Sequence, residues 1–250
     1  MPDSVWASQD AALIKDESAA PRHTLLIRLT HWVNALCFFA LLLSGIEILI
    51  SHPRFYWGET GNVMTPPLFS LHIPASRSSV PTGYKYVLPD QNGWSRNLHF
   101  QSAWLLVITG LLYGVSGIVT GHFRRNLFPA RGDLSWRSLR EAFASHLRME
   151  KTDEASYNLL QRISYVKVVF LLVPLAIWTG LAMSPAVVSA FPLMVTVFGG
   201  QQSARTVHFF VTIALVLFVI VHIVMVCITG FQSRMRAMTL GGGSTTKGQL

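Results

Sequence analysis

Four long apolar runs constrain the fold of this chain more than any other feature of its sequence. They cover approximately residues 29–50, 98–121, 165–183 and 206–231. Each has roughly the 20 residues that a helix needs to cross about 30 Å of hydrocarbon. Inside a bilayer, backbone polar groups must be bonded within the protein, so isolated apolar runs cross it as helices. The sequence predicts an all-α integral membrane protein whose four-transmembrane-helix bundle occupies residues 29–231.

Composition agrees with a membrane protein. Only 13% of the 250 residues are charged, whereas soluble domains carry about 25%. The net charge of +8 is expected to lie in cytoplasmic loops, so we infer membrane lipid and no nucleic acid as a partner. Cys37 and Cys227 both lie in apolar runs, and no Cys-x-x-Cys-His sequence occurs. A disulfide framework and covalently attached c-type haem are therefore excluded.

The distribution of Lys and Arg predicts that both termini are cytoplasmic. Fourteen of these residues lie in the tail 1–28, between the second and third runs, and in the tail 232–250, against five on the opposite side. Cytoplasmic segments carry the excess of positive charge. The loop 122–161 is then cytoplasmic, and the loop 51–97 forms an outer cap. The cap is rich in proline, glycine and aromatic residues, which favours an ordered irregular structure.

Three shorter features complete the expected architecture. Residues 136–148 are expected to form an interfacial helix with a basic face. The apolar stretch 187–198 is interrupted by Pro192 and too short to span, so it is placed on the membrane surface. Pro174 is expected to kink the third span, which has no histidine and is interpreted as a packing wall.

Histidines inside the apolar runs are the strongest functional signal. His31 begins the first run, His99 begins the second, and the fourth holds His208 and His222. Ionisable groups at such depths are costly and are usually functional. The fourteen residues between His208 and His222 correspond to about 21 Å along a helix and about 40° short of four turns. Both rings therefore project from nearly the same face, one in each leaflet.

Depth matches these histidines into two pairs. His31 and His222 lie in the cytoplasmic half, and His99 and His208 lie in the outer half. Two imidazoles from different helices at one depth can ligate a haem iron, which predicts two non-covalent b-type haems with bis-histidine ligation. A zinc site needs three or four converging ligands, which residues in two leaflets do not provide. His122, at the cytoplasmic interface, is kept as an alternative to His31.

Glycines support the same interpretation. Span two contains a stripe with 4-3-4 spacing on the face below His99, and Gly45 shares a face with His31. Missing side chains beside the histidines leave room for a flat macrocycle, although small-residue stripes also serve helix packing. The stripe comprises Gly110, Gly114, Gly117 and Gly121.

Four short motifs accompany the paired histidines: Arg28-Leu-Thr-His31-Trp32, Leu98-His-Phe-Gln-Ser-Ala-Trp104, Thr120-Gly-His-Phe-Arg124 and Thr179-Gly-Leu-Ala-Met-Ser-Pro185. With the histidines, they resemble the prokaryotic cytochrome b561 superfamily over roughly residues 22–236. This superfamily includes haem b subunits of nickel–iron hydrogenases, formate dehydrogenase gamma subunits and thiosulfate reductase cytochrome b subunits. The last three motifs look closest to members that accompany molybdopterin oxidoreductases.

The resemblance implies an electron-transfer subunit of a membrane oxidoreductase complex. Such a subunit of a bacterial inner membrane passes electrons between the quinone pool and a partner redox subunit, here expected on the outer, periplasmic face. Its ligand roles transfer onto His31, His99, His208 and His222. The two alternatives are a stand-alone superoxide:quinone oxidoreductase and a haem-free membrane scaffold or transporter.

Five residues are candidates to bind the haem propionates or quinone. Arg28 and Arg205 each precede a paired histidine by three residues, and they are candidates to bind haem propionates or to anchor the interface. A quinone pocket is expected near the inner haem, where the candidates are Asn34, His122 and Lys167.

Overall fold

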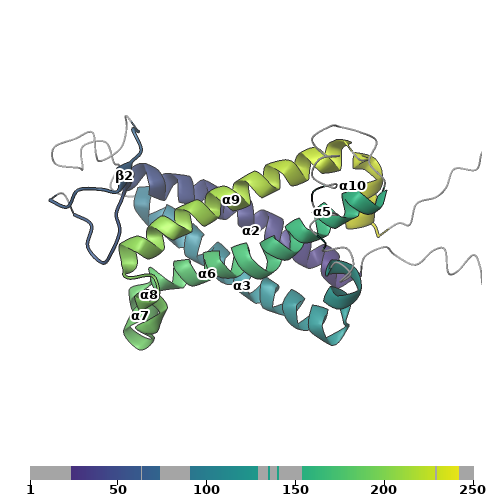
Figure 1. The fold of residues 1–250 in the computed structure, drawn as a ribbon, viewed down its shortest axis with the longest axis horizontal. Coiled ribbons are helices and arrows are strands. Elements are labelled where there is room, and N and C mark those ends of the chain that lie inside the picture. The colour runs from purple at the N-terminus through teal and green to yellow at the C-terminus, as the bar shows by residue number, and fades with distance from the viewer. Residues whose placement is uncertain are drawn as a thin grey trace, which may run out of the picture.

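The computed structural model describes residues 24–62, 64–73, 91–128, 135, 140, 154–228 and 230–241. Within them the chain is mostly helical, with one two-stranded hairpin (Figure 1). Four helices are long and apolar enough to cross a membrane: Leu25–Ser51, Gly93–Val119, Gln161–Ala182 and Gln201–Ile228. The predicted four-span helical membrane protein is therefore confirmed.

Three of the spans are single helices. These are α2 (Leu25–Ser51), α3 (Gln91–Val119) and α9 (Gln201–Ile228). The side-chain oxygen of Thr24 caps α2 by accepting from the backbone N–H of Ile27 at 3.4 Å. Helix α3 begins before the expected residue 98, and α9 begins before the expected residue 206. The additional turns of both helices lie at the same end of the bundle as the hairpin (Figure 1).

The third span is a composite helix. It consists of α5 (Glu154–Lys167), the π-helical turn η3 (Val168–Leu172) and α6 (Val173–Ala182). In η3 the N–H of Val173 bonds to the carbonyl of Val168, five residues back. Pro174 follows directly, lacks an N–H, and crowds the preceding turn. The wider π turn is how the span accommodates the proline that was expected to kink it.

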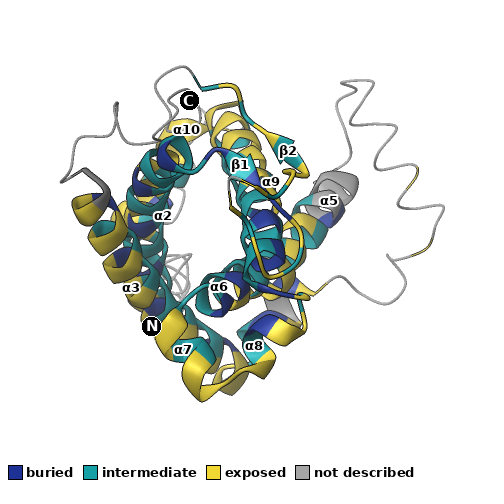
Figure 2. Ribbon diagram, turned by 90° about the vertical axis from the view of Figure 1, so that its left-hand side faces the viewer, coloured by how far each residue is buried: buried dark blue, intermediate teal, exposed yellow. Residues whose placement is uncertain are grey.

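The spans pack as two helix pairs. Helix α2 packs mainly against α3, and α6 packs mainly against α9. The view along the bundle shows the first pair on one side and α6 with α9 on the other (Figure 2). Large apolar side chains are exposed along the spans, which fits a surface that faces lipid rather than water. Examples are Leu36, Leu43, Leu111, Ile118, Leu217 and Val221.

One end of the bundle, which we call the cap end, carries the hairpin and two short helices. Strands β1 (Arg54–Phe55) and β2 (Phe69–Ser70) are antiparallel, with Phe55 opposite Phe69. Helices α7 (Pro185–Ala190) and α8 (Leu193–Thr196) follow the third span. They occupy most of the stretch that was expected to lie on the membrane surface. The cap end is the one expected to face outward.

The opposite end, which we call the α10 end, carries η2 (Phe123–Leu127) and α10 (Phe231–Thr239). Gly230, at φ 114°, separates α10 from α9, and this helix lies in the segment expected to be a tail. Arg28 donates to the carbonyl of Thr239 at 3.0 Å, and the Trp32 indole N–H donates to Met238 at 3.0 Å. The start of α2 and the end of α10 therefore meet. The expected interfacial helix at 136–148 lies, except for residue 140, outside the described residues.

Candidate metal-binding histidine pairs

The first pair lies toward the cap end. His99 of α3 and His208 of α9 face each other with ring centroids 6.4 Å apart and an interplanar angle of 63°. The two helices belong to different helix pairs, so the rings meet across the bundle. These are the two histidines that depth alone placed together.

The second pair lies toward the α10 end. His31 of α2 and His222 of α9 have ring centroids 6.5 Å apart and an interplanar angle of 54°. His222 stacks on Phe218 at 5.8 Å and lies 6.2 Å from the Tyr165 ring. Trp32 contacts His31 edge-on at 5.4 Å. Helix α9 thus presents one histidine to α3 and another to α2.

Both separations fit two imidazoles on opposite sides of one iron. With a metal–nitrogen distance of about 2 Å, such ligands place their ring centres about 6.4 Å apart. Ligation leaves each ring free to rotate about the iron–nitrogen axis, so both interplanar angles are compatible. Among the described residues, no group of three or more His, Cys, Asp or Glu could hold a metal ion. Two facing imidazoles are the donor set that a bis-histidine haem would use.

Hydroxyl groups contact both histidines of the cap-end pair. Ser44 Oγ lies 3.0 Å from His99 Nδ1, and Thr179 Oγ1 lies 2.8 Å from His208 Nδ1. Both hydroxyl residues are fully buried. The third span, which was expected only to pack, thus supplies a contact to His208. Neither hydroxyl residue was identified from the sequence.

Glycines adjoin the same two rings. A Cβ on Gly45 would lie 3.6 Å from His99 Cε1, and one on Gly180 would lie 3.7 Å from His208 Cε1. Gly45, expected to share a helix face with His31, thus lies beside His99. The span-two stripe only partly matches its expected role. A Cβ on Gly110 or Gly114 would meet no heavy atom of the described residues within 4 Å, so these two leave open space.

The other two glycines of the stripe have structural roles. A Cβ on Gly117 would overlap the ring of Phe123, because η2 turns the chain back and packs that ring against α3. Gly121 has φ 66° in the turn after α3, a conformation that glycine adopts without strain. Neither glycine clears space for a macrocycle.

Each of the two arginines precedes a histidine of one pair by three residues. Arg28 is bonded to the Thr239 carbonyl, while Arg205 donates to the carbonyl of Arg54 and lies over the Phe55 ring at 5.2 Å. The Nε atoms of both arginines are buried and have no hydrogen-bond partner among the described residues. Each guanidinium thus has one side on a backbone carbonyl and a further donor available to an acidic group.

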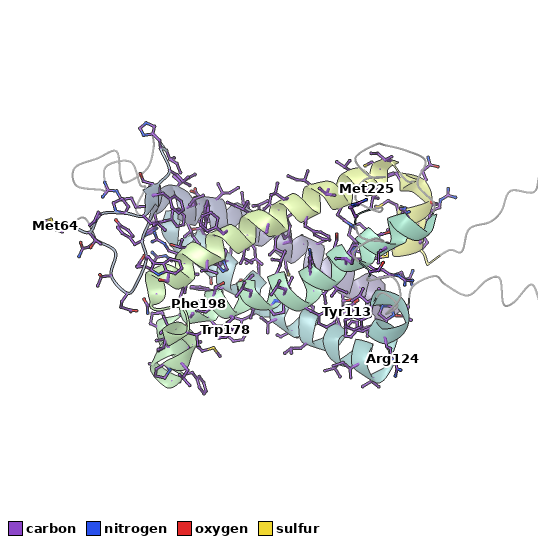
Figure 3. The ribbon with its side chains drawn as sticks, viewed as in Figure 1. Met64, Tyr113, Arg124, Trp178, Phe198 and Met225 are labelled. Carbon is purple, nitrogen blue, oxygen red and sulfur yellow. The ribbon has the colours of Figure 1, made fainter. Side chains whose placement is uncertain are left out.

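The three quinone candidates lie in different surroundings. Asn34 Oδ1 accepts from the Thr109 hydroxyl, which links α2 to α3. The His122 ring lies 6.3 Å from Tyr113, near Arg124 at the α10 end (Figure 3). Lys167 is exposed at the junction of α5 and η3. In the structure it is His31, not the alternative His122, that faces His222.

Comparison with known proteins agrees with these observations. The chain is 29% identical over 208 residues to a protein of Azospira oryzae whose name describes it as a protein-methionine-sulfoxide reductase subunit, YedZ1. The match covers 82% of this chain and 90% of that protein. No solved structure matches the chain. The sequence model of the family described as prokaryotic cytochrome b561 matches residues 22–241. The chain therefore belongs to the prokaryotic cytochrome b561 family of membrane proteins, which bind b-type haem and transfer electrons.

Proposed function

We propose that this chain is the di-haem membrane subunit of a two-component oxidoreductase. It moves electrons across a bacterial inner membrane between the quinone pool and a partner redox subunit at the cap end. The observation that carries the proposal is the presence of two histidine pairs with nearly equal ring separations, 6.4 and 6.5 Å. Both pairs use α9, so one helix fixes the spacing between the two centres.

The residues of the chain bind and orient the cofactors. His99 and His208 would hold one haem, and His31 and His222 the other. When bound, each haem supplies a reversible one-electron centre whose potential is set by its ligands, burial and hydrogen bonds. With two histidines holding each haem, the protein would supply spacing and orientation rather than a substrate-binding position on iron.

Arg28 and Arg205 would bind haem propionates at opposite ends of the bundle. Each lies one helical turn before a ligand histidine, and each has a buried Nε without a partner among the described residues. A guanidinium is well suited to bind a carboxylate because it offers several donors in a plane. Arg28→Gln and Arg205→Gln are each expected to weaken retention of the nearer haem during purification.

The quinone site is proposed beside the α10-end pair. His122 lies in an aromatic cluster with Tyr113 and Phe123, which suits a planar, apolar ring with exchangeable protons. Lys167 lies one turn before Phe170, which contacts Phe123 edge-on at 5.2 Å. Asn34 is the third candidate, and its bond to Thr109 must open before it can bind a ligand. His122→Ala and Lys167→Ala are expected to slow haem reduction by quinol without changing haem content.

The partner is proposed to be a periplasmic oxidoreductase that receives or supplies electrons at the cap-end haem. A molybdopterin oxidoreductase is the first candidate, because three motifs of this chain resemble those of family members that accompany such enzymes. The name of the Azospira oryzae relative points to protein methionine sulfoxide as one substrate class. An enzyme of the hydrogenase type is the second candidate partner.

Native purification followed by a visible spectrum tests the proposal. We expect low-spin b-type absorption, about two haems per chain by pyridine haemochromogen assay, and a co-purifying redox subunit. A haem-free scaffold predicts no Soret band. A stand-alone superoxide:quinone oxidoreductase predicts haem, turnover of superoxide, and no stable redox partner. A stoichiometry near one haem would remove one histidine pair from the proposal.

A further inference from the structure

The hydroxyl groups of Ser44 and Thr179 have already used their single protons. Ser44 Oγ donates to the carbonyl of Ala40 at 2.7 Å, and Thr179 Oγ1 donates to the carbonyl of Leu175 at 2.8 Å. Both residues are fully buried. Each hydroxyl therefore presents only a lone pair to the histidine ring beside it.

An accepting hydroxyl fixes the tautomer of its histidine. With the hydroxyl protons on the carbonyls of their own helices, the hydroxyl oxygens at 3.0 and 2.8 Å would accept, and Nδ1 of His99 and Nδ1 of His208 would each carry the proton. The lone pair of the neutral ring then lies on Nε2, which is the nitrogen left for a metal. Both ligands of the cap-end pair are thus prepared for ligation before any cofactor binds.

The Ser44–His99 and Thr179–His208 contacts occupy corresponding places in the two helix pairs. Ser44 on α2 holds the histidine of α3, and Thr179 on α6 holds the histidine of α9, in each case within one tightly packed helix pair. The two ligands of one centre are therefore fixed independently from opposite sides of the bundle. A hydrogen-bond acceptor on the distal nitrogen also makes an imidazole a more basic ligand, which stabilises oxidised iron.

We propose that Ser44 and Thr179 are positioning residues of the cap-end haem. Each fixes the Nδ1-protonated tautomer of one ligand and lowers the midpoint potential of that centre relative to an unsupported ligand. This inference rests on the proposed haem ligation at His99 and His208. It extends that proposal by naming what orients the ligands and tunes the potential.

Matched variants of the full-length protein test the inference. Ser44→Ala and Thr179→Val remove the hydroxyl, whereas Ser44→Thr and Thr179→Ser keep one. Thr212→Ala is the control, because its hydroxyl bonds to the His208 carbonyl at 2.8 Å rather than to the ring. The measurements are haem per chain, an optical redox titration, and the low-spin g-values of the oxidised protein.

We expect Ser44→Ala and Thr179→Val to raise the midpoint potential of one haem, or to lose that haem, while the other is unchanged. Ser44→Thr, Thr179→Ser and Thr212→Ala should resemble the wild type. The inference fails if Ser44→Ala and Thr179→Val keep both haems with wild-type potentials and g-values. It also fails if the hydroxyl-bearing variants or Thr212→Ala change the protein as much. A wild-type spectrum without haem would instead refute the proposed function itself.

Discussion

Thr206 donates its hydroxyl proton to the backbone carbonyl of Tyr56 at 2.7 Å, which ties the loop after α2 to α9 two residues before His208. The carbonyl of Gly58 accepts from the backbone N–H groups of Gln202 and Ser203 at 3.0 and 3.2 Å. These bonds satisfy N–H groups that the first turn of a helix leaves without partners. The loop therefore fixes the axial position of α9 and, with it, the height of His208.

Gly200 is the residue on which this junction depends. It has φ 131°, and a Cβ there would overlap the backbone of Gly58 and Glu59. Gly200→Ala is expected to cost about 1–3 kcal/mol from backbone strain, with further loss as the loop is pushed off α9. We expect a lower midpoint of thermal unfolding, together with weaker retention of the cap-end haem.

Gly93→Ala is the matched control for Gly200→Ala. Gly93 is exposed in the first turns of α3, and a Cβ there meets no heavy atom of the described residues within 4 Å. Alanine favours a helix over glycine by about 1 kcal/mol, so unfolding should be unchanged or slightly later. Equal thermal midpoints for both alanine variants would contradict the role given to the Gly200 junction.

Single-histidine variants on α9 should separate the two centres. His208→Ala is expected to remove the cap-end haem and to leave the other largely intact, and His222→Ala should do the reverse. Each variant leaves an opposing imidazole in an apolar setting, and an unsatisfied buried polar group costs about 1–3 kcal/mol. A redox titration of each purified variant, with haem counted per chain, measures both effects.

Two further variants complete this test. His122→Ala should keep both haems, since His31 rather than His122 faces His222 at 6.5 Å. His72→Ala, in the exposed part of the loop after α2, should match the wild type. If His122→Ala loses a haem while His31→Ala keeps both, the assignment of the second pair to His31 and His222 is wrong.

The histidine pairing could be predicted from helix periodicity together with depth. Ionisable residues are rare in apolar runs, and fourteen residues nearly complete four helical turns. That arithmetic puts His208 and His222 on one face before any tertiary structure is known. The depths of His31 and His99 in their runs then match them to His222 and His208, with His122 left as the alternative to His31, and the structure brings the matched rings together.

The supporting contacts could not be predicted in the same way. Ser and Thr inside a span commonly bond to their own helix, as Ser44 and Thr179 also do. Their second contact depends on which helices become neighbours, and the apolar runs do not encode that choice. For Gly117 the sequence predicted too much: the glycine was expected to leave space for a macrocycle. In the structure the ring of Phe123 fills that space, because η2 turns the chain back against α3.

Membrane orientation is testable with fusions at the chain ends. Arg28 and Thr239 are bonded at 3.0 Å, so the start of α2 and the end of α10 lie on one side. The excess of Lys and Arg in the segments on that side predicts that it is cytoplasmic. A reporter after Leu250 should be active only if it functions in the cytoplasm. A periplasm-active reporter at that position would reverse the proposed side of the partner subunit.

Gly45 and Gly180 should tolerate one added carbon and no more. A Cβ at either position lies 3.6 or 3.7 Å from a histidine Cε1, which is ordinary van der Waals contact. Gly45→Ala and Gly180→Ala are therefore expected to keep both haems. Leucine would extend past Cε1 toward Nε2, into the space that the macrocycle needs. Gly45→Leu and Gly180→Leu should each lose the cap-end haem while keeping the α10-end haem.

Leucine at a second glycine separates this effect from general crowding. No heavy atom of the described residues lies within 4 Å of a Cβ built on Gly93, so Gly93→Leu should keep both haems. Haem content by pyridine haemochromogen assay and the far-ultraviolet circular dichroism of each variant are the two measurements. A protein with Gly45→Leu that retains helical content and both haems would show that the cap-end macrocycle does not lie against α2.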